Sequence, residues 1–143
     1  ATWSPSSISY TGNNRTHMIR IPDKGRFELR LMDGAVNPYL LQAGVIAAGL
    51  HGINNKIDPG EPLSCNMYTD HKNYPHLKKL PDIIEDALDQ LENSKEINEA
   101  FGGDTIKSYL KLKRSEIKDF NQEEKFDKKS SVTHWEKNST LDC

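Results

Sequence analysis

The sequence predicts an α+β fold, with antiparallel strands in residues 1–36 and helices in residues 37–143. Apolar and polar side chains alternate at period two in the first part, which is typical of strands with one covered face. Short turn sequences separate these stretches. After residue 37 the apolar residues recur at a period of 3.6, which indicates helices.

Two extended segments and a tight turn predict an antiparallel strand pair. Residues 1–14 are expected to be extended and to end in a Thr-Gly-Asn-Asn turn. Residues 15–22 form a second extended segment, and an Asp-Lys-Gly turn follows it. Residues 26–32 then return as the partner strand, so that the segments on either side of the turn make a hairpin.

The predicted hairpin carries a local positive charge. The basic residues in it are Arg15, Arg20, Lys24, Arg26 and Arg30. Alternation puts Arg26, Glu28 and Arg30 on one face of the returning strand and apolar residues on the other. Two guanidiniums and a carboxylate side by side are suited to bind phosphate, carboxylate and a metal ion together. The competing interpretation is a solvated edge strand on which Glu28 forms a weak surface salt bridge.

The first predicted helix covers residues 38–53. Asn37 can cap it, and Pro38 suits the first turn because its missing N–H is no loss there. Gly52 can supply a left-handed stop. The side chains are apolar or small on most of the circumference, so we expect this helix to be buried on nearly all sides. A long irregular connection over residues 54–80 follows, which is typical of a functional loop or of a segment packed on a partner.

Three further helices are predicted after that connection. Their expected first or capping residues are Pro81, Ser94 and Asp104, and a Gly-Gly pair ends the second of them. The last helix keeps its apolar period as far as residue 120, and the charged run beyond residue 122 is expected to be a solvated helix end. We expect Trp135 to dock on another part of the molecule, since a free tail has little reason to carry it.

Composition bounds the possible partners and compartment. The formal net charge is −2, so nothing general suggests nucleic-acid binding. The apolar run over residues 39–50 is shorter than the ~20 residues that span a bilayer, and no signal sequence opens the chain, so we expect no membrane and a cytoplasmic protein. The chain begins without Met, which suggests a piece of a longer protein. Cys65 and Cys143 have no metal-ligand spacing and are expected to be unpaired thiols.

Three other groups of polar residues have two interpretations each. His17 could be a ligand, but alternation favours a packing or hydrogen-bonding histidine. The cluster Asp70, His71 and His76 looks like a metal site, but its spacing fits no helix face and no Cys accompanies it, which favours a surface loop. The basic run at residues 111–114 is most simply a solvated helix face.

A series of motifs resembles the glutamine synthetase family. The motifs are Asn-Arg-Thr, Arg-Ile-Pro, Arg-x-Glu-x-Arg, an Asp, Asn-Pro-Tyr and a helix rich in Ala and Gly, and they stand at residues 14–16, 20–22, 26–30, 33, 37–39 and 47–53. The similarity continues through residues 55–62, 66–68 and 80–92 and covers nearly the whole chain. The resemblance is to the C-terminal part of the catalytic domain, in which residues 1–36 would be strands of a curved catalytic sheet and residues 37–143 its helical part.

The resemblance implies separate roles for the residues of the hairpin. Arg15 matches a catalytic arginine that touches the transferred phosphoryl group and the glutamate side. Arg20 and Arg26 match arginines that hold ATP phosphates. Glu28 matches a carboxylate ligand of the second divalent ion, Mg²⁺ or Mn²⁺, and would stay ionised between its arginines. Arg30 matches the arginine that pairs with the carboxylate of glutamate.

This sequence departs from the family pattern in two ways. The loop between the Arg-Ile-Pro and Arg-x-Glu-x-Arg motifs is shorter than in several members, so Lys24 is only an approximate match to a lysine assigned to ATP. The family's N-terminal domain and the first half of its catalytic domain, with the carboxylates of the first metal, have no counterpart in this sequence. The family's site is also completed by a neighbouring subunit of a homo-oligomer. Alone, this segment is therefore expected to be inactive.

The implied function is that of an ATP-dependent glutamate–ammonia ligase. ATP phosphorylates the γ-carboxylate of glutamate, and ammonia attacks the γ-glutamyl phosphate to give glutamine. Residues 16–22, 25–34 and 135–143 are similar to the branch that includes γ-glutamylmethylamide synthetases, so methylamine is the alternative nucleophile. A second alternative is a non-catalytic truncated paralogue, which binds nucleotide or assembles with full-length subunits.

Overall fold

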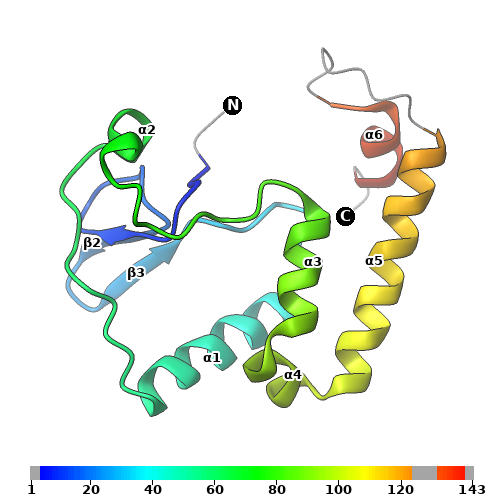
Figure 1. Cartoon of the computed structure of the whole chain (residues 1–143), viewed down its shortest axis with the longest axis horizontal. Coiled ribbons are helices and arrows are strands. Elements are labelled where there is room, and N and C mark those ends of the chain that lie inside the picture. The colour runs from blue at the N-terminus through cyan, green and yellow to red at the C-terminus, as the bar shows by residue number, and fades with distance from the viewer. Residues whose placement is uncertain (1–3, 124–131, 141–143) are drawn as a thin grey trace. The chain divides into compact units, whose positions relative to one another are not determined.

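The computed structural model describes residues 4–123 and 132–140 (Figure 1). It has the predicted α+β composition, with strands first and helices after them. The chain forms two compact units, which are Ala1–Asp33 with Ile57–Ile84 and Gly34–Lys56 with Glu85–Cys143. The charged run predicted beyond residue 122 as a solvated helix end lies outside the described residues from residue 124 on, as does the expected free thiol of Cys143.

A three-stranded sheet forms the centre of the first unit. Its strands are β1 (Tyr10–Thr11), β2 (Ile19–Asp23) and β3 (Arg26–Leu29), in that order across the sheet. β2 and β3 are antiparallel, so the predicted hairpin is confirmed. The turn between them contains Gly25 at φ +78°, a conformation that glycine adopts without steric cost. β1 pairs with β2 in parallel, a pairing of two residues that the sequence did not predict.

The predicted extended segments are longer than the strands that form. Residues 15–18 were expected to be extended, but they are in turns and bends. The physical reason is an Asx turn, since the side-chain oxygen of Asn14 accepts a hydrogen bond of 2.9 Å from the backbone N–H of Thr16. The returning strand ends at Leu29 rather than at residue 32.

Residues 57–84 complete the first unit by returning to its N-terminal part. The backbone N–H of Ile8 donates to Lys78, and that of Leu80 donates to Ser6. This stretch also contains α2 (Met67–Asp70) and the 3₁₀ helix η1 (His71–Asn73). The expected irregular connection therefore includes short helices and is anchored to the beginning of the chain.

The second unit begins with α1 (Pro38–Asn54). Asn37 caps it as predicted, with its side chain accepting from the N–H groups of Tyr39 and Leu40 at 3.0 and 3.1 Å. The predicted stop at Gly52 is wrong, because the helix continues to Asn54 and the left-handed residue is Lys56, with φ 51°.

The expectation that α1 is buried on nearly all sides is also wrong for the described part of the chain. No residue of α1 is buried, and Tyr39 at its start is 82% exposed. The physical reason is that α4 (Lys95–Phe101) is the main helix that packs against α1 within this unit. A short helix covers one face of a longer one, and the rest of the apolar surface stays open.

Three helices enclose the core of the second unit. These are α3 (Ile84–Asn93), α4 and α5 (Gly103–Glu123), and their buried residues Leu88, Ile106 and Leu110 form one cluster. α3 starts three residues after the predicted Pro81. Ser94 caps α4 and Gly102, at φ +78°, ends it, as predicted.

The last helix, α6 (His134–Thr140), lies against the end of α5. The ring of Trp135 meets that of Phe120 edge to face, with 5.6 Å between centroids and an interplanar angle of 85°. The predicted docking of Trp135 is confirmed. By contrast, Asp104 does not precede α5 as its predicted cap, because the helix already begins at Gly103 and the Asp104 side chain is exposed in its first turn.

Candidate functional site

One face of the β2–β3 hairpin brings together Arg20, Glu28 and Arg30. Arg20 and Glu28 are cross-strand partners, and Arg30 lies two residues beyond Glu28 on the same face. Arg20 Nη1 donates to Glu28 Oε2 at 2.6 Å, and Arg30 Nε donates to Glu28 Oε1 at 3.2 Å. Each carboxylate oxygen therefore holds one guanidinium, and we call these three residues the Arg-Glu-Arg face.

Asn13 fixes the Arg20 guanidinium from a second direction. Its side-chain oxygen accepts from Arg20 Nε at 3.0 Å and also from Arg20 Nη2. The Arg20 side chain is only 11% exposed. Sequence patterns did not indicate Asn13, because a Thr-Gly-Asn-Asn stretch signals a turn and does not show which side chain it will meet.

The face is charged in a way that keeps Glu28 ionised. The hydrogen bond from Arg20 is the largest cause that lowers the pKa of the Glu28 carboxyl below its ordinary value, and partial desolvation opposes it. The positive charges of Arg20, Arg30 and Arg15 lower it further. Glu28 is therefore an anion at neutral pH, as the sequence predicted.

Arg15 contributes to this face through its backbone and presents its side chain to solvent. Its carbonyl oxygen accepts from Arg30 Nη1 and, at 3.3 Å, from the hydroxyl of Tyr68. Among the described residues its guanidinium has no ion-pair partner.

Lys24 and Arg26 are exposed at the turn end of the hairpin. The sequence grouped Arg26 with Glu28 and Arg30, but the arginines that pair with Glu28 are Arg20, which faces it across the hairpin, and Arg30.

The Glu28 carboxylate can act as a metal ligand, but it would be only one of several ligands in a complete site. Each of its oxygens has two lone pairs and accepts one hydrogen bond from an arginine, which leaves capacity for a hard cation on the side chain's exposed part, 41% of its surface. The described residues contain no group of three or more His, Cys, Asp or Glu side chains that could hold a metal ion. A complete site would need ligands in addition to those described.

His17 belongs to the same loop as Arg15, two residues further along the chain. It is completely buried, with Nδ1 3.1 Å from the hydroxyl of Ser9 and Nε2 3.0 Å from the carbonyl of Cys65. A carbonyl only accepts, so Nε2 donates its proton to Cys65, and Nδ1 and the Ser9 hydroxyl share the second hydrogen bond. The interpretation of His17 as a hydrogen-bonding histidine is confirmed.

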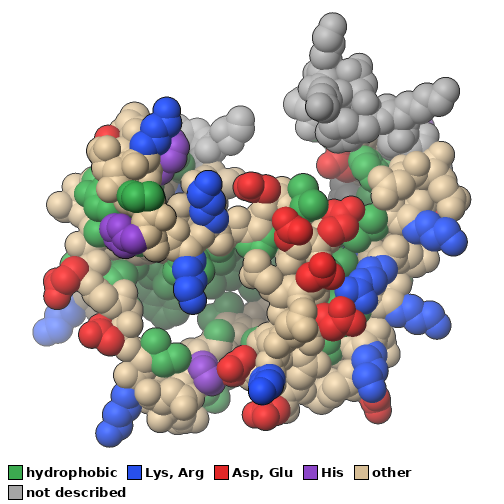
Figure 2. Space-filling model, viewed as in Figure 1, with side chains coloured by type: hydrophobic (Ala, Val, Ile, Leu, Met, Phe, Trp, Pro, Cys, Tyr) green, Lys and Arg blue, Asp and Glu red, His purple; other side chains and the backbone are tan. Residues whose placement is uncertain are grey.

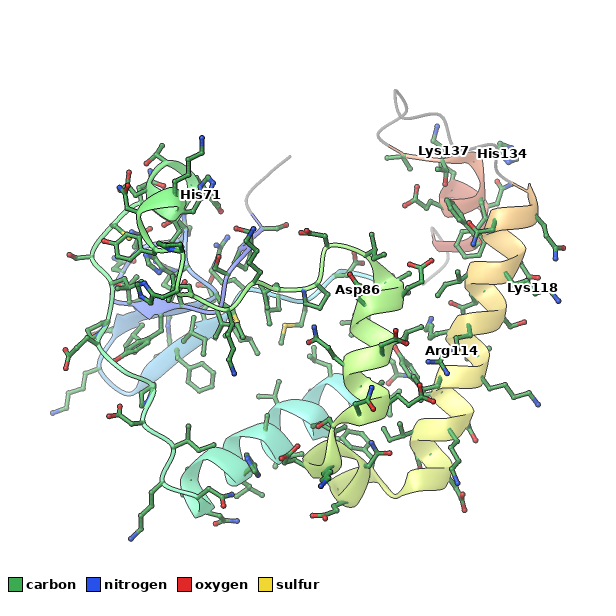
Figure 3. The ribbon with its side chains drawn as sticks, viewed as in Figure 1. His71, Asp86, Arg114, Lys118, His134 and Lys137 are labelled. Atoms are coloured by element: carbon green, nitrogen blue, oxygen red, sulfur yellow. The ribbon has the colours of Figure 1, made fainter. Side chains whose placement is uncertain are left out.

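The cluster around α2 serves local structure. The carboxylate of Asp70 accepts from the backbone N–H of Asn66 at 3.1 Å and from the hydroxyl of Thr69 at 2.9 Å. His71 is exposed on η1 (Figure 3), and the ring of His76 meets Tyr74 edge to face. These contacts agree with the surface-loop interpretation.

The basic run at residues 111–114 is not uniformly solvated. Arg114 reaches from α5 to α3 (Figure 3), where its Nη2 lies 3.1 Å from Asp89 and 2.6 Å from Glu92. Figure 2 shows acidic and basic side chains interspersed over these two helices. The run therefore contributes ion pairs between helices and does not form a basic binding patch.

No helix among residues 4–123 and 132–140 combines the length and the apolar character that crossing a bilayer requires.

Known proteins resemble this chain along nearly its whole length. The family model described as "Glutamine synthetase, catalytic domain" matches residues 1–136. A glutamine synthetase of Rhizobium meliloti (strain 1021) is 49% identical over 142 residues, which cover 99% of this chain and 31% of the relative. A glutamate–methylamine ligase of Methyloversatilis universalis is 40% identical over 145 residues, which cover 99% of this chain and 30% of the relative.

A solved structure described as a GmaS/ADP complex has the same fold. It superposes with a TM-score of 0.80 at 43% identity, over 99% of this chain and 30% of that chain. An apo GmaS structure gives a TM-score of 0.78 at the same identity. The chain thus spans about a third of the length of the relatives it matches.

Proposed function

Because the chain belongs to the glutamine synthetase family, a family of ligases, we propose that it provides one wall of the active site of an ATP-dependent glutamate–ammonia ligase. In this reaction ATP transfers its γ-phosphoryl group to the side-chain carboxylate of glutamate and leaves as ADP. Ammonia then attacks the γ-glutamyl phosphate, and phosphate departs to leave glutamine. The observation that carries the proposal is the Arg-Glu-Arg face, in which one ionised carboxylate holds two guanidiniums.

Catalysis of phosphoryl transfer depends mainly on positive charges that the protein holds in fixed positions. The transition state spreads negative charge over the phosphoryl oxygens, and donors that are already in place stabilise it without reorganisation. Arg20 meets this requirement because Glu28 and Asn13 hold its guanidinium. In our proposal Arg20 and Arg26 bind the phosphates of ATP, and Lys24 contributes a further positive charge to the same phosphates. Arg15 contacts the γ-phosphoryl group while it is transferred to glutamate.

Glu28 would provide one ligand of a divalent ion, Mg²⁺ or Mn²⁺. Such an ion, when bound, neutralises phosphate charge. Glu28 also has a second task, since it orients Arg20 and Arg30. Arg30 would bind the carboxylate of the substrate glutamate, a role for which a positioned guanidinium fork is better suited than a flexible ammonium. Its side chain is 14% exposed and is held by Glu28 and by the carbonyl of Arg15.

Methylamine is the second candidate nucleophile. This alternative is favoured by the 40% identical glutamate–methylamine ligase and by the 43% identical GmaS structures. It is ranked second because the 49% identical relative is a glutamine synthetase. We further propose that the full enzyme acts in the cytoplasm as a homo-oligomer, in which a neighbouring subunit completes the site.

A chimaeric enzyme tests the proposal directly. Residues 1–143 replace the matching segment of the Rhizobium meliloti glutamine synthetase, and the formation of glutamine from glutamate, ATP and ammonia is measured. We expect turnover that depends on Arg15, so that Arg15→Ala abolishes it. A chimaera that assembles as its host does and yet makes no product would refute the proposal and support the non-catalytic alternative.

Two comparisons complete the experiment. The same segment placed in the glutamate–methylamine ligase should leave that host's amine preference unchanged, whereas a shift toward methylamine in the glutamine synthetase host would favour the alternative nucleophile. The isolated 143-residue chain should form no γ-glutamyl hydroxamate from hydroxylamine. Turnover by that chain at the rate of the chimaera would contradict the expectation that part of the site is missing.

A further inference from the structure

The loop that carries Arg15 is fastened to a segment far along the chain. Residues 12–18, the Arg15 loop, are not part of a strand, and residues 65–68 lie beside them. The side-chain amide of Asn14 donates to the Cys65 carbonyl at 2.9 Å, and the N–H of Met67 donates to the Thr16 hydroxyl at 3.0 Å. His17 and Tyr68 add two more bonds between the same segments. We call these four hydrogen bonds the clamp.

The clamp holds the backbone of Arg15, the residue that is proposed to contact the transferred phosphoryl group. The carbonyl of Arg15 accepts from Tyr68 on one side and from Arg30 on the other. It therefore links residues 65–68 to the Arg-Glu-Arg face through a single oxygen atom. Thr16, next to it, accepts from Met67, whose side chain is buried at 5% exposure.

The side chain of Arg15 has no comparable support. It is exposed, and among the described residues its guanidinium forms no hydrogen bond or ion pair. The direction in which this side chain leaves the protein therefore depends on the backbone of the Arg15 loop. The two ends of the Arg15 loop are bonded to the hairpin, since Gly12 accepts from the N–H of Ile21 and Met18 from that of Arg30. Between these ends the loop is outside the strands, and there the clamp bonds it to residues 65–68.

We propose that Thr16 and Tyr68 are positioning residues, which fix the Arg15 loop so that the Arg15 side chain meets the transferred phosphoryl group. This inference rests on the proposed function. Both residues act through Arg15 and touch no reacting atom. Since a misplacement of about 1 Å can cost up to about a hundredfold in rate, loss of one clamp bond is expected to lower kcat.

The kinetic test uses matched variants of the chimaeric enzyme. Tyr68→Phe and Thr16→Val each remove one clamp hydroxyl, and we expect kcat to fall about tenfold while KM for ATP and glutamate changes less than about twofold. Thr16→Ser keeps the hydroxyl and should restore kcat. Tyr10→Phe is the control, because the Tyr10 hydroxyl donates to the Gly60 carbonyl at 2.6 Å in the same unit but outside the clamp.

Two kinetic results would overturn the inference. One is an equal loss of kcat in Tyr10→Phe and Tyr68→Phe, which would mean that any lost bond in this unit suffices. The other is a Thr16→Ser enzyme as slow as Thr16→Val, which would show that the hydroxyl is not what matters.

Hydrogen exchange separates this inference from the proposed function. In the same chimaera the Met67 amide should exchange at least about tenfold faster in Thr16→Val than in the unsubstituted enzyme, and Thr16→Ser should keep it protected. Equal exchange of the Met67 amide in the unsubstituted chimaera, Thr16→Val and Thr16→Ser would overturn the inference that the clamp fixes the Arg15 loop, even if the enzyme were active. An inactive chimaera with the expected exchange pattern would instead overturn the proposed function, and the positioning role with it.

Discussion

Glu28 is the residue on which the geometry of the candidate site depends. Its two oxygens hold Arg20 and Arg30, so a single carboxylate sets the spacing of two cations that would otherwise repel each other. The side chain is 41% exposed, so solvent screens these pairs and their value lies in orientation more than in stability.

The ionisation of Glu28 gives a prediction for pH. Its folded-state pKa lies below the ordinary value of 4.5 because of the hydrogen bond from Arg20, so its contribution to stability is fully present above the unfolded pKa. That contribution is lost as the pH falls through the lowered pKa, that is, below 4.5. A ¹³C NMR titration of the labelled chain should find the Glu28 midpoint below 4.5, and Arg20→Gln should raise it. An unchanged midpoint in that variant would show that the Arg20 hydrogen bond is not what lowers the pKa.

Arg30 gives a prediction for substrate binding. In the chimaeric enzyme Arg30→Ala should raise KM for glutamate about tenfold or more, because it removes a charge-assisted hydrogen bond to a carboxylate. KM for ATP should change less than about twofold. Arg26→Ala is the matched control and should show the reverse pattern. Equal changes in both constants for Arg30→Ala would refute its assignment to glutamate.

At the scale of residues, the sequence predicted Glu28 and Arg30 on one face, but it named Arg26 as the second arginine, whereas Arg20 of the facing strand forms that ion pair. Period two was enough to place Glu28 and Arg30 side by side, because that relation is local. The contacts of Asn14 and Tyr68 join residues 51 and 53 positions apart, and no local pattern indicates them. The Asn-Arg-Thr motif includes Asn14 and Thr16, but the sequence assigned them no role, and their contacts with residues 65–68 are visible only in the structure.

At the scale of elements, the sequence predicted those boundaries that a nearby side chain creates. The caps of α1 and α4 were correct because Asn37 and Ser94 bond to N–H groups two or three residues away. The stop at Gly52 was wrong because a glycine permits a left-handed turn without requiring one. The parallel pairing of β1 with β2 was not predictable, since nothing in two residues specifies a partner strand.

The core of the second unit gives a prediction for stability. Leu110 and Leu112 are two residues apart on α5, but Leu110 is 4% exposed and Leu112 is 57% exposed. Leu110→Ala should lower the free energy of unfolding by about 2–4 kcal/mol, because it leaves a cavity beside Leu88 and Ile106. Leu112→Ala should change it by less than about 0.5 kcal/mol. Urea denaturation of the two variants measures the difference, and similar losses would contradict the observed packing.

At the scale of the whole molecule, α1 exposes an unusual amount of apolar surface. Its large apolar side chains Tyr39, Ile46, Leu50 and Ile53 are 53–82% exposed. Exposed apolar surface of this extent is typical of an interface. The apolar character of α1 was predicted correctly from the sequence, but composition does not tell which surface covers it.

This exposure gives a prediction for the isolated chain. The 143-residue chain should associate as its concentration rises, because association buries the apolar side chains of α1. Size-exclusion chromatography with light scattering measures the mass. Replacing Ile46 and Ile53 by Lys should reduce association, whereas Leu112→Lys on α5 serves as the control for added charge. A monodisperse monomer with a cooperative thermal transition would contradict the prediction.

The division of the first unit between two stretches of chain has a consequence for the order of events in folding. The hairpin of β2 and β3 closes over a turn of residues 24–25, and hairpins form within microseconds. The contacts between residues 65–68 and residues 12–18 close a loop of about fifty residues. Closing such a loop costs chain entropy, so contacts this distant in sequence form slowly. We therefore expect Arg20 and Glu28 to meet before residues 65–68 fix the direction of Arg15.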